Sequence, residues 1–274
     1  MRSNESSRMA ASDVAFAYSA TTLLLTALWI ALLRHKSLSL LSYAMYFPTI
    51  VFIPFGLYTG DFSAFLRTMF IPTSSTVYGL VVGTIYVVVL VFTCAFLSVI
   101  VGWGRLVFDS KTLGASSQAV HAHNRNLLLG FLRALGEEIG WRGYLLPLLM
   151  STYSPFVALL YSGVVWFLFH VPVMVLMTRT LAVPNAAVVC LVQGSSCALA
   201  AFSFGYVGVV SGYGAWAPGF AHFFMNRLNP VVLGSVYTQT SGMIVGPVWK
   251  VNGEGLMGCI VGALLAVWVV FNVN

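Results

Sequence analysis

Residues 77–101, VYGLVVGTIYVVVLVFTCAFLSVIV, decide the fold class of this chain. The stretch contains no Asp, Glu, Lys or Arg. Its length as a helix exceeds the about 20 apolar residues that cross the hydrocarbon core of a bilayer. Seven more stretches on either side are similarly apolar: 13–33, 38–58, 127–149, 155–177, 183–203, 214–235 and 255–273. The sequence therefore predicts an all-α polytopic bundle of about eight transmembrane helices.

The composition agrees with a chain that lies mostly in lipid. Charged residues make up 7% of the 274 residues and hydrophobic residues 59%, with a mean hydropathy of +0.92. A soluble domain carries about 25% charged residues, so soluble enzymes, disordered proteins and nucleic-acid-binding proteins are excluded. Eight spans use roughly 160 residues, which leaves no room for a separate extramembranous domain. We expect one integral membrane domain, 1–274, whose chemistry lies in or at the membrane.

Basic residues in the connections indicate an orientation. Seven of them lie on one side of an eight-span chain: Arg34, Lys36, Arg105, Lys111, Arg125, Arg179 and Lys250. Three lie on the other: Arg2, Arg8 and Arg67. Because cytoplasmic loops carry the excess of Lys and Arg, both termini are expected outside, with the net charge of +6 facing anionic lipid headgroups. Asn4-Glu5-Ser6 would then be a glycosylation sequon on the outer tail.

Three segments need separate interpretations. The stretch 13–33 is expected to be a retained helix, because it is long and has no small-x-small cleavage site before Arg34. Residues 61–71 are too short to span and are expected at the membrane interface. The segment from Gly194 to Gly219, rich in Gly, Ser and Tyr, is expected to be close-packed or irregular and to line a cavity.

Ionisable residues inside spans are costly and usually functional, and the richest group lies in 127–149. Glu138 and Arg142 are four residues apart, so they share a helix face and can neutralise each other. Glu137 points elsewhere, along a stripe with Arg133, Trp141 and Tyr144. Gly136, Gly140 and Gly143 thin this helix so that neighbours can approach closely. A carboxylate beside another carboxylate in lipid is a candidate general base.

Two further spans carry histidine. His170 follows Trp166 by one turn and precedes Pro172, and His222 precedes Asn226 by one turn. Taken singly, His170 fits a satisfied core histidine, and His222 with Asn226 fits an inter-helix hydrogen-bond pair. Counted along their helices, however, Glu137, His170 and His222 fall within roughly 10 Å of one depth. A shared intramembrane site is therefore the better interpretation.

The three motifs in this order resemble the CPBP family, the CAAX proteases and bacteriocin-processing enzymes also called the abortive-infection family. The motifs are EEIGWRGYLLP at 137–147, VVWFLFHVP at 164–172 and HFFMN at 222–226. The first has the prokaryotic form. The resemblance covers about 127–235 in detail, which we take as the catalytic core. Trp166 is a departure, since many relatives have Phe there.

This resemblance implies an intramembrane endopeptidase with a catalytic cavity inside the helical bundle. Glu137 and His170 would activate a water, while His222 and Asn226 would hold the oxyanion of the tetrahedral intermediate. Glu138 and Arg142 would be structural and orienting, and Trp141 and Trp166 would wall the substrate cavity. The expected substrate is a membrane-tethered or prenylated, CAAX-like peptide. The protein would sit in the plasma membrane of a prokaryote or the endoplasmic reticulum of a eukaryote.

Alternatives remain open at this point. Glu137, His170 and His222 could bind zinc as a two-His-one-carboxylate set. The HExxH spacing is absent and each ligand would come from a separate helix, so we favour a mechanism without a cofactor. A non-catalytic immunity or scaffold protein could keep the same fold. A transporter is disfavoured because the intramembrane charges lie only in the second half of the chain.

Overall fold

The computed structural model describes residues 9–33, 38–60, 62–108 and 126–273, and within these ranges the chain is almost entirely helical. The first half contains α1 (Ala11–Leu33), the 3-10 helix η1 (Leu38–Tyr46), α2 (Phe47–Thr59), α3 (Phe62–Phe70), α4 (Ser74–Ile100) and β1 (Arg105–Leu106). The second half contains α6 (Leu127–Glu138), η2 (Ile139–Leu145), α7 (Leu146–Met150), α8 (Pro155–Thr180), α9 (Ala186–Val210), α10 (Trp216–Leu233), β2 (Ile244–Val245), α11 (Val248–Val251) and α12 (Leu256–Asn272). The two short strands pair antiparallel, Arg105 opposite Val245.

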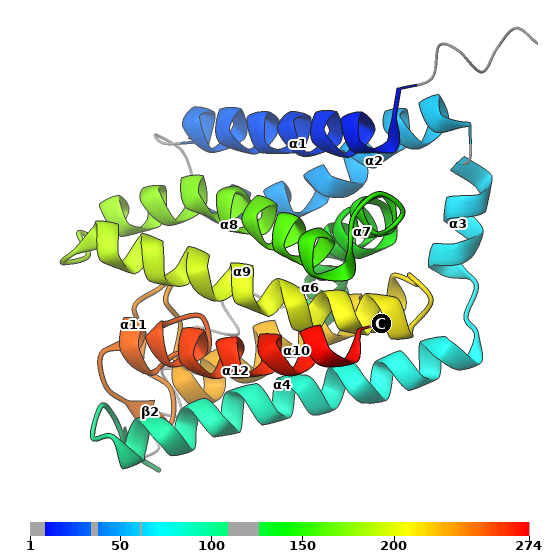
Figure 1. Cartoon of the computed structure of the whole chain (residues 1–274). Coiled ribbons are helices and arrows are strands. Elements are labelled where there is room, and N and C mark those ends of the chain that lie inside the picture. Colours follow the sequence, from blue (N-terminus) through cyan, green and yellow to red (C-terminus); the bar gives the residue numbers. More distant parts are fainter. Residues whose placement is uncertain (1–8, 34–37, 61, 109–125, 274) are drawn as a thin grey trace, which may run out of the picture.

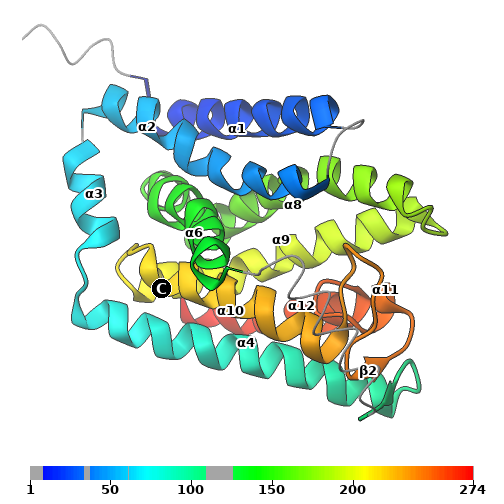
Figure 2. The ribbon, with the colours of Figure 1, turned by 180° about the vertical axis from the view of Figure 1, so that it is seen from behind.

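The helices form a bundle in which the long elements run roughly side by side (Figure 1). The helix α9 packs most extensively on α8 and also on α12, while α10 packs on α4 and α6. The opposite view shows α6 inside the bundle, between α2 and α10 (Figure 2). The acidic motif therefore lies in the interior of the molecule.

Six helices in the described part of the chain are long and apolar enough to cross a membrane: Ala11–Leu33, Leu40–Thr59, Ser74–Ile100, Pro155–Thr180, Ala186–Val210 and Val248–Asn272. They confirm a helical polytopic bundle. The other two predicted spans, 127–149 and 214–235, are helical but more polar, because they carry the charged and histidine residues of the three motifs. The count of eight is therefore not confirmed.

Large apolar side chains project from the outside of the bundle. Leu24 on α1 is 70% exposed, Phe96 on α4 is 65% exposed and Phe271 on α12 is 77% exposed. In water such a surface would be unfavourable, whereas in lipid it costs nothing. The helix α3 is only nine residues long and runs across the direction of the long helices at one end of the bundle (Figure 1). That placement fits the expected interfacial segment.

Several sequence predictions are only partly covered by the structure. Arg2, Arg8, Arg34, Lys36, Lys111, Arg125 and the sequon at Asn4 lie outside the described residues, so the orientation stays a prediction. In the segment 194–219, residues up to Val210 form the regular helix α9. Its glycines allow close packing, since a Cβ at Gly208 would lie 3.2 Å from Arg142 Cβ. For residues 194–210 the prediction of close packing is therefore confirmed, and the prediction of an irregular backbone is wrong.

The glycines of the acidic motif admit neighbouring elements as predicted. Gly136 faces Tyr46, Gly143 faces Met69, and Gly140 faces Pro48 together with the Tyr18 hydroxyl. At Gly140 the α1 and α2 helices are tied together, because the Tyr18 hydroxyl donates to the Pro48 carbonyl at 2.8 Å. The acidic motif is thus clamped against the first two helices.

Replacing Gly140 by alanine is expected to lower the free energy of unfolding by about 1–3 kcal/mol, the usual cost of overpacking. The added methyl would overlap Pro48 backbone and the Tyr18 hydroxyl, neither of which can move without breaking the bond between α1 and α2. Thermal unfolding in detergent measures the effect. Gly262→Ala is the matched control, because its nearest neighbour is Leu199 Cβ at 3.3 Å. Equal stability of both variants would contradict the clamp.

Candidate active site

The acidic motif lies at a change of helix type. The α-helix α6 ends at Glu138, and residues Ile139–Leu145 form the π-helix η2 before α7 continues the same axis. Short π segments inside α-helices occur frequently at functional sites. All residues from Ala134 to Leu146 are buried, so both carboxylates of the motif must find partners within the protein.

Glu137 is held by two tryptophans. Its Oε2 atom accepts a hydrogen bond from Trp166 Nε1 at 2.9 Å and another from Trp141 Nε1 at 3.3 Å. The residue is 2% exposed. In the described part of the chain it has no ion-pair partner, and its Oε1 atom accepts no hydrogen bond. A buried carboxylate with one engaged and one uncommitted oxygen is suited to take a proton from a bound water.

Glu138 has a different environment. Its Oε1 atom pairs with Arg142 Nη1 at 3.0 Å, as the spacing predicts, and also contacts His222 Nδ1 at 2.9 Å. Arg142 is fully buried, and its guanidinium lies 4.3 Å from the Trp166 ring centroid and 5.3 Å from that of Phe204. The sequence did not predict the contact with His222. Glu138 is therefore the hub of an Arg–Glu–His chain that links η2 to α10.

The two histidines approach the same tryptophan. His170 Nδ1 bonds the Trp166 carbonyl at 2.8 Å, and the His170 and His222 rings lie 5.5 and 5.7 Å from the Trp166 ring. His170 is 8% and His222 6% exposed. Since Nδ1 of each ring is engaged, Nε2 is the nitrogen left for substrate or water. Glu137, His170 and His222 thus meet around Trp166, as their common depth predicts.

Asn226 lies one turn beyond His222 on α10 and is half-buried. Its side chain makes no hydrogen bond within the described ranges. The two predicted cavity tryptophans, Trp141 and Trp166, do lie beside the candidate residues, but their indole N–H groups point to Glu137. Their positions fix the carboxylate, and their part in substrate contact stays a prediction.

With this geometry in place, the comparison with known families can be interpreted. Residues 119–228 match the family model described as type II CAAX prenyl endopeptidase Rce1-like. The resemblance to the CPBP family is confirmed. The matched segment contains all six candidate residues: Glu137, Glu138, Arg142, His170, His222 and Asn226. No curated protein matches the chain. Since CPBP enzymes of the Rce1-like type are proteases, the match supports a peptidase of the CAAX type in a multi-pass membrane protein.

A zinc site in this core would need three ligands around one point. Among the described residues, no three His, Cys, Asp or Glu side chains are grouped so that they could hold a metal ion. The Nδ1 bonds of His222 to Glu138 and of His170 to a backbone carbonyl leave Nε2 of each ring for a ligand, as in many zinc sites. Because the three predicted ligands are not grouped in this arrangement, we derive no catalytic step through a metal.

One further acidic residue was not among the candidates predicted from the sequence. Glu254 lies just outside the predicted span 255–273. In the structure it interacts electrostatically with His222 and Glu137. The sequence does show an acidic residue directly before the apolar stretch 255–273. It does not predict, however, that residue 254 lies near residue 222 in the fold.

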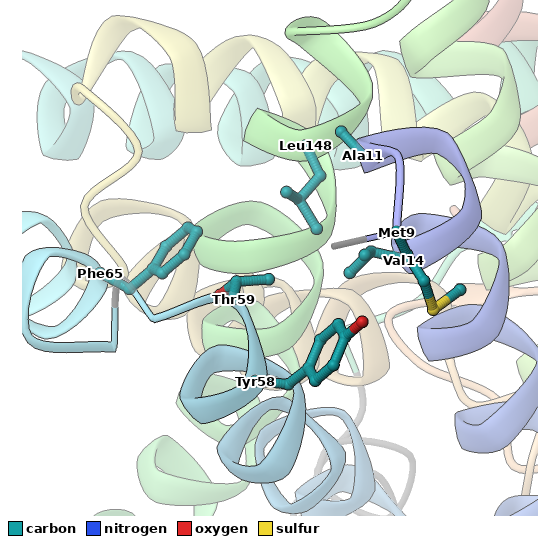
Figure 3. A pocket seen from close by; sticks show the side chains of 7 residues that line it. All are labelled: Met9, Ala11, Val14, Tyr58, Thr59, Phe65 and Leu148. Carbon is teal, nitrogen blue, oxygen red and sulfur yellow. The ribbon is translucent and has the colours of Figure 1, made fainter. Parts of the chain in front are cut away.

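Two hollows lie near α3 rather than at the CPBP motifs. The first, of about 210 Å³, is mostly apolar and is lined by Met9, Ala11, Val14, Tyr58, Thr59, Phe65 and Leu148 (Figure 3). The second, of about 260 Å³, is also lined by Phe65, together with other residues of α3 and with Gly143, Pro147 and Tyr213. Neither is lined by Glu137, His170 or His222. The predicted catalytic cavity stays a prediction.

Proposed function

We propose that this protein is an intramembrane endopeptidase that hydrolyses a peptide bond in a membrane-tethered substrate, with Glu137 as general base. The observation that carries the proposal is the state of Glu137. Two indole N–H groups hold one carboxylate oxygen, the other oxygen accepts no hydrogen bond from the described residues, and the neighbouring acid Glu138 is already paired. The two adjacent acids therefore have different tasks.

The first step is activation of water. Glu137 Oε1 takes a proton from a water that also bonds His170 Nε2, and the water oxygen attacks the carbonyl carbon of the scissile peptide. No serine or cysteine nucleophile is needed, because the base and the orienting imidazole together supply a nucleophile. The aromatic wall formed by Trp141 and Trp166 keeps the carboxylate in place during the transfer.

The second step is collapse of the tetrahedral intermediate. Its oxyanion accepts hydrogen bonds from His222 Nε2 and the Asn226 amide, which lie one turn apart on α10. Such donors are among the largest contributions to catalysis in acyl transfer. The carbon–nitrogen bond then breaks, and the proton held by Glu137 passes to the leaving amine. Glu138 and Arg142 orient His222 and do not touch the substrate.

The substrate class follows from the family and the membrane setting. The matched family is described as prenyl endopeptidases, and this chain exposes an apolar outer surface that faces lipid. A peptide carrying a prenyl group would reach such a protein within the membrane plane. We therefore propose a prenylated, CAAX-like peptide as the substrate.

The test is a cleavage assay in liposomes with matched prenylated and unprenylated peptides. We expect wild type to cleave the prenylated peptide, and Glu137→Gln to be inactive. Activity is expected to persist in the presence of a zinc chelator. Loss of activity on chelation, restored by added zinc, would contradict the metal-free mechanism. Identical behaviour of wild type and Glu137→Gln in all assays would instead favour a non-catalytic protein of the same fold.

A further inference from the structure

A short non-helical connection, Asn252–Gly255, joins α11 to α12 and is firmly held from two sides. Asn229 on α10 donates to Asn252 Oδ1 at 3.0 Å and accepts from Gly253 N at 3.1 Å. Ser196 on α9 donates to the Gly253 carbonyl at 3.3 Å. Asn252 is fully buried. The backbone that carries Glu254 is therefore fixed between α9 and α10.

This connection runs along the face of α10 that carries His222. Met225 and Asn229 follow His222 at helical spacing. A Cβ at Gly253 would lie 2.7 Å from Asn229 Oδ1 and 3.1 Å from Met225 Cε, so glycine is needed for the close approach. Gly253 therefore allows the connection to approach α10 closely, which brings Glu254 beside the face of α10 that carries His222.

The Glu254 side chain belongs to a polar chain that reaches the proposed catalytic centre. Gln193 Nε2 on α9 donates to the Tyr237 hydroxyl at 2.8 Å. Since Tyr237 accepts this bond, its own proton is free to bond the Glu254 carboxylate. Burial raises the pKa of Tyr237 well above its ordinary value, so the phenol stays protonated as a donor. Glu254 in turn interacts electrostatically with His222 and Glu137.

Glu254 is a third acidic residue near the proposed catalytic centre, which indicates a functional role. Ionisable side chains within a membrane-embedded bundle are rare and usually functional. Four acidic residues lie within the described ranges. Glu138 contacts His222 directly, Glu137 and Glu254 interact with it electrostatically, and Asp13 is exposed at the start of α1.

We propose that Glu254 is a positioning residue of the catalytic centre, which acts with Glu138 on the His222 ring. His222 Nδ1 faces the Glu138 carboxylate, so an oxyanion contact from Nε2 requires a ring that donates from both nitrogens and carries positive charge. The other charged or titratable groups that interact with His222 are Glu137, Arg142 and His170. Arg142 disfavours that charge, and the ionised form of Glu254 favours it. This inference rests on the proposed function for its catalytic consequence.

The experiment compares Glu254→Gln, Glu254→Asp and Tyr237→Phe with wild type in the liposome assay. We expect Glu254→Gln to lower kcat about tenfold to a hundredfold with KM changed less than twofold, because substrate binding is not touched. Glu254→Asp keeps the charge and should retain kcat within about threefold of wild type. Tyr237→Phe should fall between them. Asp13→Asn, which removes an acid far from His222, is the matched control.

A second readout does not depend on activity. In protein labelled with ¹⁵N-histidine, Glu254→Gln should shift the ring signals assigned to His222 by comparison with His222→Gln, at unchanged thermal stability. Unmoved His222 signals, or a Glu254→Gln variant with wild-type kcat, would overturn the inference. So would equal losses of kcat and stability in Glu254→Gln and Glu254→Asp. If wild type cleaves no peptide, the proposed function fails, while the His222 signals still decide the role of Glu254.

Discussion

Glu137→Gln is expected to lower kcat for peptide hydrolysis by about 10³-fold, within the range of general-base catalysis. The substitution is isosteric and keeps an oxygen that can accept from the Trp166 and Trp141 indoles, which bond Oε2 at 2.9 and 3.3 Å. What it removes is the capacity to take a proton from water. KM should change little, because the carboxylate acts on the water and not on substrate binding.

Single-turnover cleavage of a fluorescent peptide in liposomes measures this loss even when the rate is too low for a steady-state assay. Asp13→Asn controls for removing a negative charge, since Asp13 lies exposed at the start of α1. Thermal unfolding should show Glu137→Gln to be as stable as wild type. A variant that keeps more than a tenth of wild-type kcat would remove Glu137 from the role of base.

Residue spacing and the rise per residue of an α-helix predicted the parts of the site that lie within one helix or at one depth in the membrane. The four-residue spacing of Glu138 and Arg142 predicted their ion pair, and the three glycines predicted the close approach of neighbouring elements, which are η1 at Gly136, α1 and α2 at Gly140, and α3 at Gly143. Residue counts along the spans gave the common depth of His170 and His222. These are properties of a helix axis, which sequence fixes through the rise per residue.

The rotation of each helix about its own axis, and the contacts between elements distant in the sequence, could not be predicted in the same way. The bond from His222 to Glu138 depends on how α10 is turned about its axis, and the indole bonds to Glu137 depend on side-chain rotamers of α8 and η2. The position of Glu254 depends on a bend held by Asn229. The count of eight spans is not confirmed, because residues 127–149 and 214–235 are helical but more polar than the six apolar helices.

Arg142→Met is expected to lower the free energy of unfolding by about 3–5 kcal/mol, the cost of leaving one partner of a buried ion pair alone. Arg142 and Glu138 are both fully buried, and both the Arg142 and the His222 contacts are made by Oε1 of Glu138, while Oε2 accepts no hydrogen bond within the described residues. Methionine keeps the apolar volume beside Trp166 and Phe204, so the charge is the main loss. The free energy is measured by denaturant titration in mixed micelles.

The double variant Glu138→Gln with Arg142→Met separates charge from packing. Neutralising Glu138 removes the carboxylate that has lost its arginine, so the double variant should recover part of the stability lost by Arg142→Met, which gives a coupling energy between the two sites in the cycle. It should still be less stable than wild type, because His222 loses the carboxylate that holds Nδ1 at 2.9 Å. Among molecules that remain folded, kcat should fall less than in Glu137→Gln. A buried charge that loses its partner in this core has no solvent to stabilise it, so a loss of stability is expected. Unchanged stability of both variants would show that the Arg–Glu–His chain does not stabilise the fold.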